Sequence, residues 1–179
     1  MVYSIGDTIP SYVRSKRLDS LGFNAKKLLA YLNSDQFDQD WDNKIGLFFY
    51  GDDTNITSIF HRLAYDFHHI MEHKVFVTSP LRIARLIETD HLDIVNEALT
   101  CDVLFIDNFY DAATTCVIQG RERGLFEDFI RDRITHSFGA TNYFIATNPP
   151  TSCEWWSSDL YNLLAMYTRP FGMLKSGRG

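Results

Sequence analysis

Residues 51–58, with the sequence GDDTNITS, have the length and position of a loop that binds the phosphates of a nucleotide. Such a loop has the pattern G-x-x-x-x-G-K-[ST], in which backbone amides face the phosphates, the lysine reaches the terminal phosphates and the hydroxyl holds a metal ion. Gly51 and Ser58 match the pattern, whereas Ile56 replaces the second glycine and Thr57 replaces the lysine. Taken alone, the segment is more typical of an ordinary turn between a strand and a helix.

Two acidic residues in this segment reverse the charge that a phosphate would meet. Asp52 and Asp53 bring negative charge to the place where the anion would arrive, and Thr57 supplies no cation to offset it. Each such charge pairing is worth roughly a few kcal/mol at the effective dielectric of a protein. We therefore expect a degenerate phosphate loop without strong binding of ATP, and no cofactor unless the degenerate site still holds ATP with Mg²⁺.

Polar residues at the ends of two later apolar runs fit the same kind of site. Asp107 ends the run at 103–106, as does the carboxylate that organises Mg²⁺ in nucleotide hydrolases. A second carboxylate usually follows and activates water, but here the next residue is Asn108, which cannot act as a base. Asn148 follows the run at 143–147, where a polar residue can sense a γ-phosphate. In this interpretation the three residues are vestigial catalytic residues.

Short apolar runs separated by helical periodicity predict a three-layer α/β domain with a mainly parallel sheet. The expected strands cover residues 45–50, 74–78, 103–106 and 143–147. Helices are expected near residues 24–33, 59–71, 80–87, 92–99, 124–137 and 159–167. The acidic stretch at 34–43 is expected to be loop-like. Binding sites of parallel sheets form at the carboxyl ends of the strands, where the candidate residues above fall.

Composition limits the classes of protein that this chain can belong to. The 179 residues suffice for one domain, which we divide into a more polar lead-in segment with a short helix (1–43) and an α/β core (44–179). Seventeen basic and 23 acidic residues give a net charge of −6, which argues against a protein that coats nucleic acid but leaves room for a local basic patch. Three cysteines without a CxxC pair, no secretory signal and no long apolar run predict a cytoplasmic protein without a membrane partner.

Several segments, in this order, resemble AAA+ ATPases, and among these the DnaC/DnaI-type replicative helicase loaders of bacteria and phages. The resemblance covers roughly residues 9–174 and includes the segments GLFFYG, VFVTSPLRIARLI, CDVLFIDNF, FEDFIRDRI, YFIATN and LLAMYTRPFGML. It implies a P-loop NTPase-like fold without a C-terminal lid, and it places Arg133 and Arg169 where such proteins carry arginines that act on a neighbouring subunit. The departures at Thr57 and Asn108 imply a pseudo-ATPase.

Two arginine clusters are candidate DNA contacts. Arg82 and Arg85 lie one turn apart on a predicted helix, and Arg121 and Arg123 belong to a second cluster. In a protein that binds single strands, such residues can track the phosphates. A surface face neutralised by neighbouring acidic residues is an equally weighted alternative.

The sequence favours structural roles for its clustered histidines and for its adjacent tryptophans. His61, His68, His69 and His73 crowd one predicted helix, but no third ligand is evident, so a solvated polar face is favoured over a metal site. For the pair Trp155-Trp156, one ring in the core and one at its edge is favoured over a partner-contact or base-stacking platform.

The leading hypothesis is a non-hydrolysing AAA+-like accessory protein of DNA replication, of phage or mobile-element type. Its expected partners are a replicative helicase or another replication protein, with single-stranded DNA and self-assembly left open. One alternative is an atypical ATPase whose missing catalytic groups come from a partner. A viral superfamily-3-type helicase fragment fits less well, because such enzymes need an intact phosphate loop. A structural or inhibitory interaction protein that only reuses the fold is the last alternative.

Overall fold

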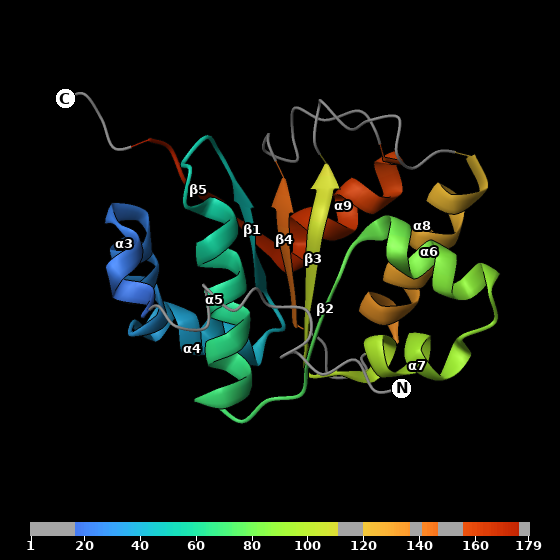
Figure 1. Cartoon of the computed structure of the whole chain (residues 1–179), viewed down its shortest axis with the longest axis horizontal. Coiled ribbons are helices and arrows are strands. Elements are labelled where there is room, and N and C mark those ends of the chain that lie inside the picture. Colours follow the sequence, from blue (N-terminus) through green and yellow to red (C-terminus); the bar gives the residue numbers. More distant parts are fainter. Residues whose placement is uncertain (1–16, 111–119, 137–140, 147–155, 176–179) are drawn as a thin grey trace.

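The computed structural model describes residues 17–110, 120–136, 141–146 and 156–175 of the chain, and Figure 1 shows their arrangement. The strands are β1 (Gly46–Tyr50), β2 (Val75–Thr78), β3 (Val103–Tyr110), β4 (Thr141–Ala146) and β5 (Thr168–Gly172). The helices are the 3-10 helix η1 (Leu18–Leu21), α3 (Phe23–Leu32), α4 (Asp35–Asp42), α5 (Ile56–His69), α6 (Pro80–Glu88), α7 (Leu92–Thr100), α8 (Gly120–Thr135) and α9 (Ser158–Tyr167).

The strands form one sheet in the order β2-β3-β4-β1-β5, and every pair is parallel. The helices α3, α4 and α5 lie on one side of this sheet, and α6, α7, α8 and α9 lie on the other (Figure 1). This arrangement confirms the predicted three-layer α/β fold. Within the described residues, no helix is long and apolar enough to cross a membrane.

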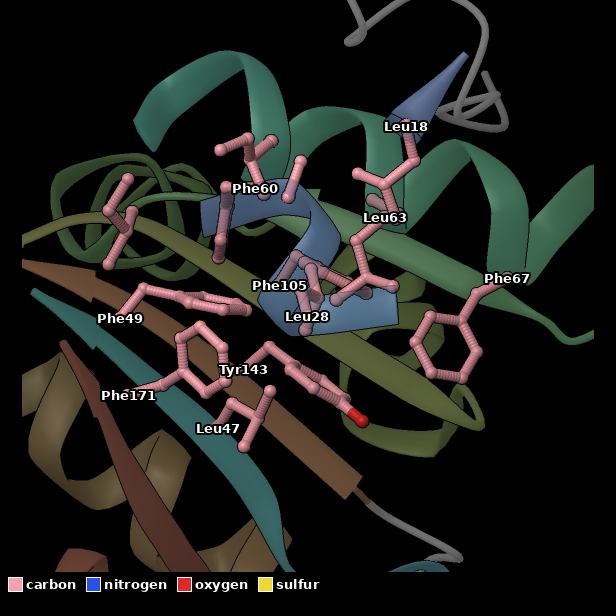
Figure 2. Close-up of a cluster of buried hydrophobic side chains, with 14 of the residues drawn as sticks. Leu18, Leu28, Leu47, Phe49, Phe60, Leu63, Phe67, Phe105, Tyr143 and Phe171 are labelled. Atoms are coloured by element: carbon pink, nitrogen blue, oxygen red, sulfur yellow. The ribbon is translucent and has the colours of Figure 1, made fainter. Parts of the chain in front are cut away.

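Consecutive strand residues supply the two cores, because side chains alternate between the faces of a strand. Leu47 and Phe49 of β1 pack with α3 and α5, whereas Phe48, between them, packs with the helices on the other side. The first core is rich in aromatic rings, and Figure 2 shows Phe49, Phe105 and Tyr143 side by side across three strands. Burial on both faces explains why the first four strands have near-continuous apolar sequences.

Residues 34–43 were expected to be loop-like, and this prediction was wrong, because they contain α4. The Ser34 hydroxyl caps the helix by accepting a hydrogen bond from the backbone N–H of Phe37. Phe37 and Trp41, four residues apart, face the core, where the Trp41 ring stacks on Phe67 at a centroid distance of 5.7 Å. Acidic residues in the first turn suit the positive end of the helix dipole.

The sheet also has a strand that the apolar pattern did not indicate. The strand β5 pairs with β1 along its whole length, from Thr168 opposite Gly46 to Gly172 opposite Tyr50. Its sequence, TRPFG, contains proline and glycine, which disfavour strands in the middle of a sheet. Both are tolerated here because β5 is the edge strand, beyond β1.

Candidate functional site

The loop between β1 and α5 (51–55) lies at the carboxyl end of β1, where the sequence predicts the degenerate phosphate loop. Gly51 has a φ of +133°, and a Cβ atom added to it would lie 2.2 Å from the carbonyl oxygen of Met173. Residue 51 must therefore be glycine because the backbone that follows β5 runs against it. This requirement comes from the fold and involves no phosphate.

Backbone hydrogen bonds tie the segment 173–175 to this loop. The N–H of Asp53 donates to the carbonyl of Met173 at 3.0 Å, and the N–H of Met173 donates to the carbonyl of Tyr50 at 2.7 Å. Two residues after Met173, the backbone N–H of Lys175 donates to the side-chain carboxylate of Asp52 at 2.9 Å. Asp52, which the sequence analysis treated as a repulsive charge, is therefore also an anchor for the segment that follows β5.

The carboxylate of Asp53 is bonded both to the loop and to α3. It accepts a hydrogen bond from the backbone N–H of Asn55 at 2.9 Å and from the side-chain amide of Asn24, on α3, at 2.6 Å. The same Asn24 amide also donates to the carbonyl of Leu174 at 2.9 Å. A backbone amide that would face a phosphate in a working loop is thus already bonded to an anion of the chain itself.

The remaining residues of the predicted loop lie in the first turn of α5. Thr57, at the position of the missing lysine, is exposed, and Ser58 is half-buried. Asn148, the predicted sensor of a γ-phosphate, lies outside the described residues.

Asp107 is bonded to a histidine that sequence reasoning did not connect with it. One carboxylate oxygen, Oδ2, lies 3.1 Å from Nε2 of His61, on α5. The other oxygen, Oδ1, accepts a hydrogen bond from the backbone N–H of Asn108 at 2.8 Å. Asn108 is exposed and has a φ of +49°. The strand was expected to end at residue 106, but β3 continues to Tyr110 through an irregularity in its pairing with β4 between Ile106 and Tyr110.

His61 corrects the expectation that the histidines of this helix form a solvated face. Its side chain is 8 % exposed, and its Nδ1 atom is buried without a hydrogen-bond partner among the described residues. The buried face of α5 is wider than its apolar stripe, because Asp107 gives His61 a polar partner beside the sheet. His69 is exposed, while His68 and His73 are half-buried. Within the described ranges, no group of three His, Cys, Asp or Glu side chains is placed to hold a metal ion.

Arg133 was expected to act on a neighbouring subunit, and its burial contradicts that role. The residue is fully buried, and its guanidinium donates to the side-chain oxygen of Asn142 at 2.6 Å. It also donates to the backbone carbonyls of Ala98, Leu99, Cys101 and Thr141 at 2.9–3.3 Å. Burial lowers the pKa of Arg133, although nearby groups partly offset this effect. The guanidinium binds the carbonyls at the end of α7 and is inaccessible to a partner.

Arg169 is bound within its own chain but remains accessible. Its Nε and Nη2 atoms donate to the two carboxylate oxygens of Asp40, on α4, each at 2.9 Å. The Arg169 side chain is 44 % exposed and that of Asp40 is 3 % exposed. Tyr31 and Gln36 also donate to Asp40, at 2.7 and 2.8 Å. No sequence signal connects these positions, because the contact joins segments 129 residues apart.

The arginines proposed as DNA contacts belong to neighbouring helices on one side of the sheet. Arg82 and Arg85 lie on α6, and both line a cavity between α6 and α7. Arg121, near the start of α8, lies 3.9 Å from the carboxylate of Glu88 on α6. Arg123 is exposed. The expected neutralisation by an acidic neighbour therefore applies to Arg121, which is paired with Glu88.

Trp156 agrees with the structural interpretation of the tryptophan pair. It is 4 % exposed and stacks on Phe109 at a centroid distance of 5.1 Å, and its indole N–H donates to the carbonyl of Phe109. Trp155 lies outside the described residues, as do Cys116 and Cys153. The described cysteine, Cys101, is buried, and burial raises its pKa to about 11, which makes it a poor nucleophile.

No family model matches the sequence, and no curated protein does so either. Solved structures, in contrast, include clear neighbours. A DNA replication initiation factor matches with a TM-score of 0.60 and 14 % identity over 88 % of this chain and 50 % of that one. AMPPCP-bound DnaA from Aquifex aeolicus matches with a TM-score of 0.62 and 14 % identity over 92 % of this chain and 51 % of that one.

A third neighbour is the replication initiator DnaA bound to AMPPCP and single-stranded DNA, with a TM-score of 0.53 and 15 % identity over 76 % of this chain and 44 % of that one. The chain spans about half the length of these structures. At such low identity the likeness shows the fold alone: these structures share the α/β arrangement described above.

Proposed function

We propose that this chain is a non-hydrolysing AAA+-like accessory protein of DNA replication, which resembles a helicase loader and acts through protein contacts and single-stranded DNA. The observation that carries the proposal is that the loop after β1 is closed, meaning that its polar groups are already hydrogen-bonded within the chain. There Asp53 bonds to Asn55 and Asn24, and the segment 173–175 is also bonded to the loop. ATP would have to displace these bonds and approach two carboxylates without a lysine to offset them.

The surroundings of Asp107 support the same conclusion. A magnesium-organising carboxylate should present its oxygens to the ion and its water molecules, but each oxygen of Asp107 already accepts a hydrogen bond from within the chain. His61 approaches the carboxylate from α5, the helix on which Ser58 would hold the metal. Asn108 cannot take a proton from an attacking water.

A role in replication is proposed from the fold and from the motif resemblance. The neighbours named above are replication initiators, and one of them was solved with single-stranded DNA. In this proposal the partner is a replicative helicase or another replication protein. Arg169, accessible at the edge strand, is the arginine that we propose for contacts with a partner or a second copy of the chain.

A second candidate function is an atypical ATPase completed by a partner. It is favoured by the presence of Ser58 and Asp107 at the positions that a metal-nucleotide complex requires, and two neighbours were solved with AMPPCP. In that case the partner would supply the cation that Thr57 lacks.

The two candidates are distinguished by calorimetric titration of the full chain with ATP and Mg²⁺, alone and with a candidate helicase present. We expect no binding in the micromolar range and no release of phosphate in either condition. Binding or turnover that appears only with the partner supports the second candidate. Micromolar binding by the chain alone contradicts both the closed-loop argument and the non-hydrolysing assignment.

A further inference from the structure

The strand β5 forms one edge of the sheet. It pairs with β1 on one side, and in the order of the described strands none lies beyond it on the other. Such an edge presents backbone N–H and C=O groups with which a strand of another molecule can pair. The opposite edge strand, β2, has four residues, whereas β5 has five and continues into the segment 173–175. The free edge of β5 is therefore the longer of the two.

The hydrogen bonds to β1 show which residues of β5 face this free edge. Backbone groups of successive residues point alternately to the two sides of a strand. Met173, directly after β5, donates its N–H to the carbonyl of Tyr50 on β1, so Phe171, two residues earlier, also directs its backbone groups toward β1. Pro170 and Gly172 consequently face the free edge. Proline is compatible with this position, because the residue needs no N–H toward β1.

Lys27, on α3, occupies the backbone acceptor of Gly172 at this edge. Its ammonium group donates to the carbonyl of Gly172 at 3.2 Å and lies 4.6 Å from the centroid of the Phe171 ring. Tyr31, one turn further along α3, has its ring centroid 6.5 Å from that of the same phenylalanine. These contacts hold α3 beside β5, as Figure 1 shows, and they place the lysine ammonium at the strand edge.

Both residues that face the edge oppose pairing with the same strand of a second copy. In an antiparallel pair of identical strands related by a two-fold axis, the residue on the axis exchanges N–H···O bonds with its own counterpart. With Pro170 on the axis, no N–H is present to donate. With Gly172 on the axis, its carbonyl must accept from the N–H of its counterpart, but Lys27 already donates to that carbonyl. Each register therefore lacks a group that it needs.

We propose that Pro170 and Lys27 close the free edge of β5 to pairing with a second copy of the chain. Pro170 closes it permanently, whereas Lys27 closes it through a contact that can be released. Prolines and charged side chains, lysine above all, are a means by which folded proteins avoid edge-to-edge association. A partner that meets this edge therefore does so through side chains such as Arg169. The inference holds whether or not that partner belongs to DNA replication.

The test compares self-association of the full chain and its variants by sedimentation velocity over a range of concentrations. Lys27→Ala frees the carbonyl of Gly172 in both copies, so hydrogen bonds can form across the axis, and we expect the association constant to rise by about tenfold or more. Lys26→Ala is the matched control, because it removes the same charge from the preceding, also exposed position of α3. The control should associate no more than the wild type. Lys27→Arg, which keeps a cationic donor at this position, should also match the wild type.

Hydrogen exchange measured by NMR identifies the surface that associates. The N–H of Gly172 should exchange rapidly in the wild type and slowly in associated Lys27→Ala. Equal association constants of Lys27→Ala and Lys26→Ala overturn the proposal, as does association of Lys27→Ala that leaves Gly172 unprotected. Slow exchange of Gly172 in the wild type also overturns it, because the edge would then already be paired. Thermal unfolding checks that Lys27→Ala is folded, and if it is not, the wild-type exchange rate decides.

Discussion

Two arginines that the motif resemblance treats alike differ in the groups that surround them. Arg133 is enclosed by backbone carbonyls, so its charge is compensated by dipoles inside the domain. Arg169 meets a buried carboxylate, Asp40, while a large part of its own side chain remains in solvent. Sequence reasoning identifies both as arginines near the ends of elements, but it cannot distinguish them because burial depends on contacts with distant segments.

The carboxylate of Asp40 makes a pH-dependent contribution to stability. Burial alone would raise the pKa of Asp40, but hydrogen bonds from Arg169, Tyr31 and Gln36 outweigh burial and hold the pKa below its ordinary value. A lowered pKa in the folded state means that the stabilisation is present above the unfolded-state pKa, near 4, and is lost as the pH falls through the folded-state value. Asp40→Asn should therefore cost about 1–3 kcal/mol at neutral pH.

Urea unfolding of wild type and Asp40→Asn across the acidic range checks this prediction. The difference in free energy of unfolding should be largest at neutral pH and should shrink below about pH 4. Taking the difference removes the contributions of other acids, including Asp66, whose pKa burial raises. A difference that stays constant with pH would show that the ionised form of Asp40 contributes no stability.

At the scale of elements, the contact between the loop after β1 and the segment after β5 is tested by two glycines. Gly51→Ala should destabilise the fold by about 2 kcal/mol or more, because its φ of +133° and the nearby carbonyl of Met173 both oppose a Cβ atom. Gly124→Ala is the control: it lies within α8 with no atom within 4 Å of an added Cβ. It should stabilise by about 0.5–1 kcal/mol. Thermal unfolding of the two variants measures both effects, and equal stabilities would contradict a closed loop.

The predictability of the elements follows from how each is buried. The strands β1 to β4 are buried on both faces and have continuous apolar sequences, so the sequence indicates them directly. The strand β5 is exposed at Arg169 and Pro170, and half of the residues of α4 are acidic while two aromatic residues face the core, so neither has a strong pattern. The predicted loop lies directly after β1, but Asp107, which was expected to follow its strand, lies within β3, because β3 continues to Tyr110. The partners Asn24 and His61 were not predicted, because their contacts join residues 29 and 46 positions apart.

For the whole molecule, the net charge of −6 limits how many DNA phosphates the chain can contact. An acidic surface repels a polyanion at long range, so attraction must come from local cationic groups such as Arg82 and Arg85 in the cavity between α6 and α7. Few phosphates can then be neutralised at once. This separates the protein from those that coat DNA, whose basic surface contacts many phosphates and releases many counterions.

The salt dependence of binding to oligo(dT), a single-stranded DNA, measures this number of contacts. Each neutralised phosphate of a single strand adds about −0.7 to the slope of log K against log salt, so two arginines predict a slope of about −1.4. The double variant Arg82→Ala with Arg85→Ala should bring the slope close to zero, and Arg131→Ala, which removes the same kind of charge from α8, should leave it unchanged. A slope steeper than about −4 would require at least five or six phosphate contacts, more than this cavity can supply. Such a slope would place the DNA on a broad basic surface that the charge of this chain argues against.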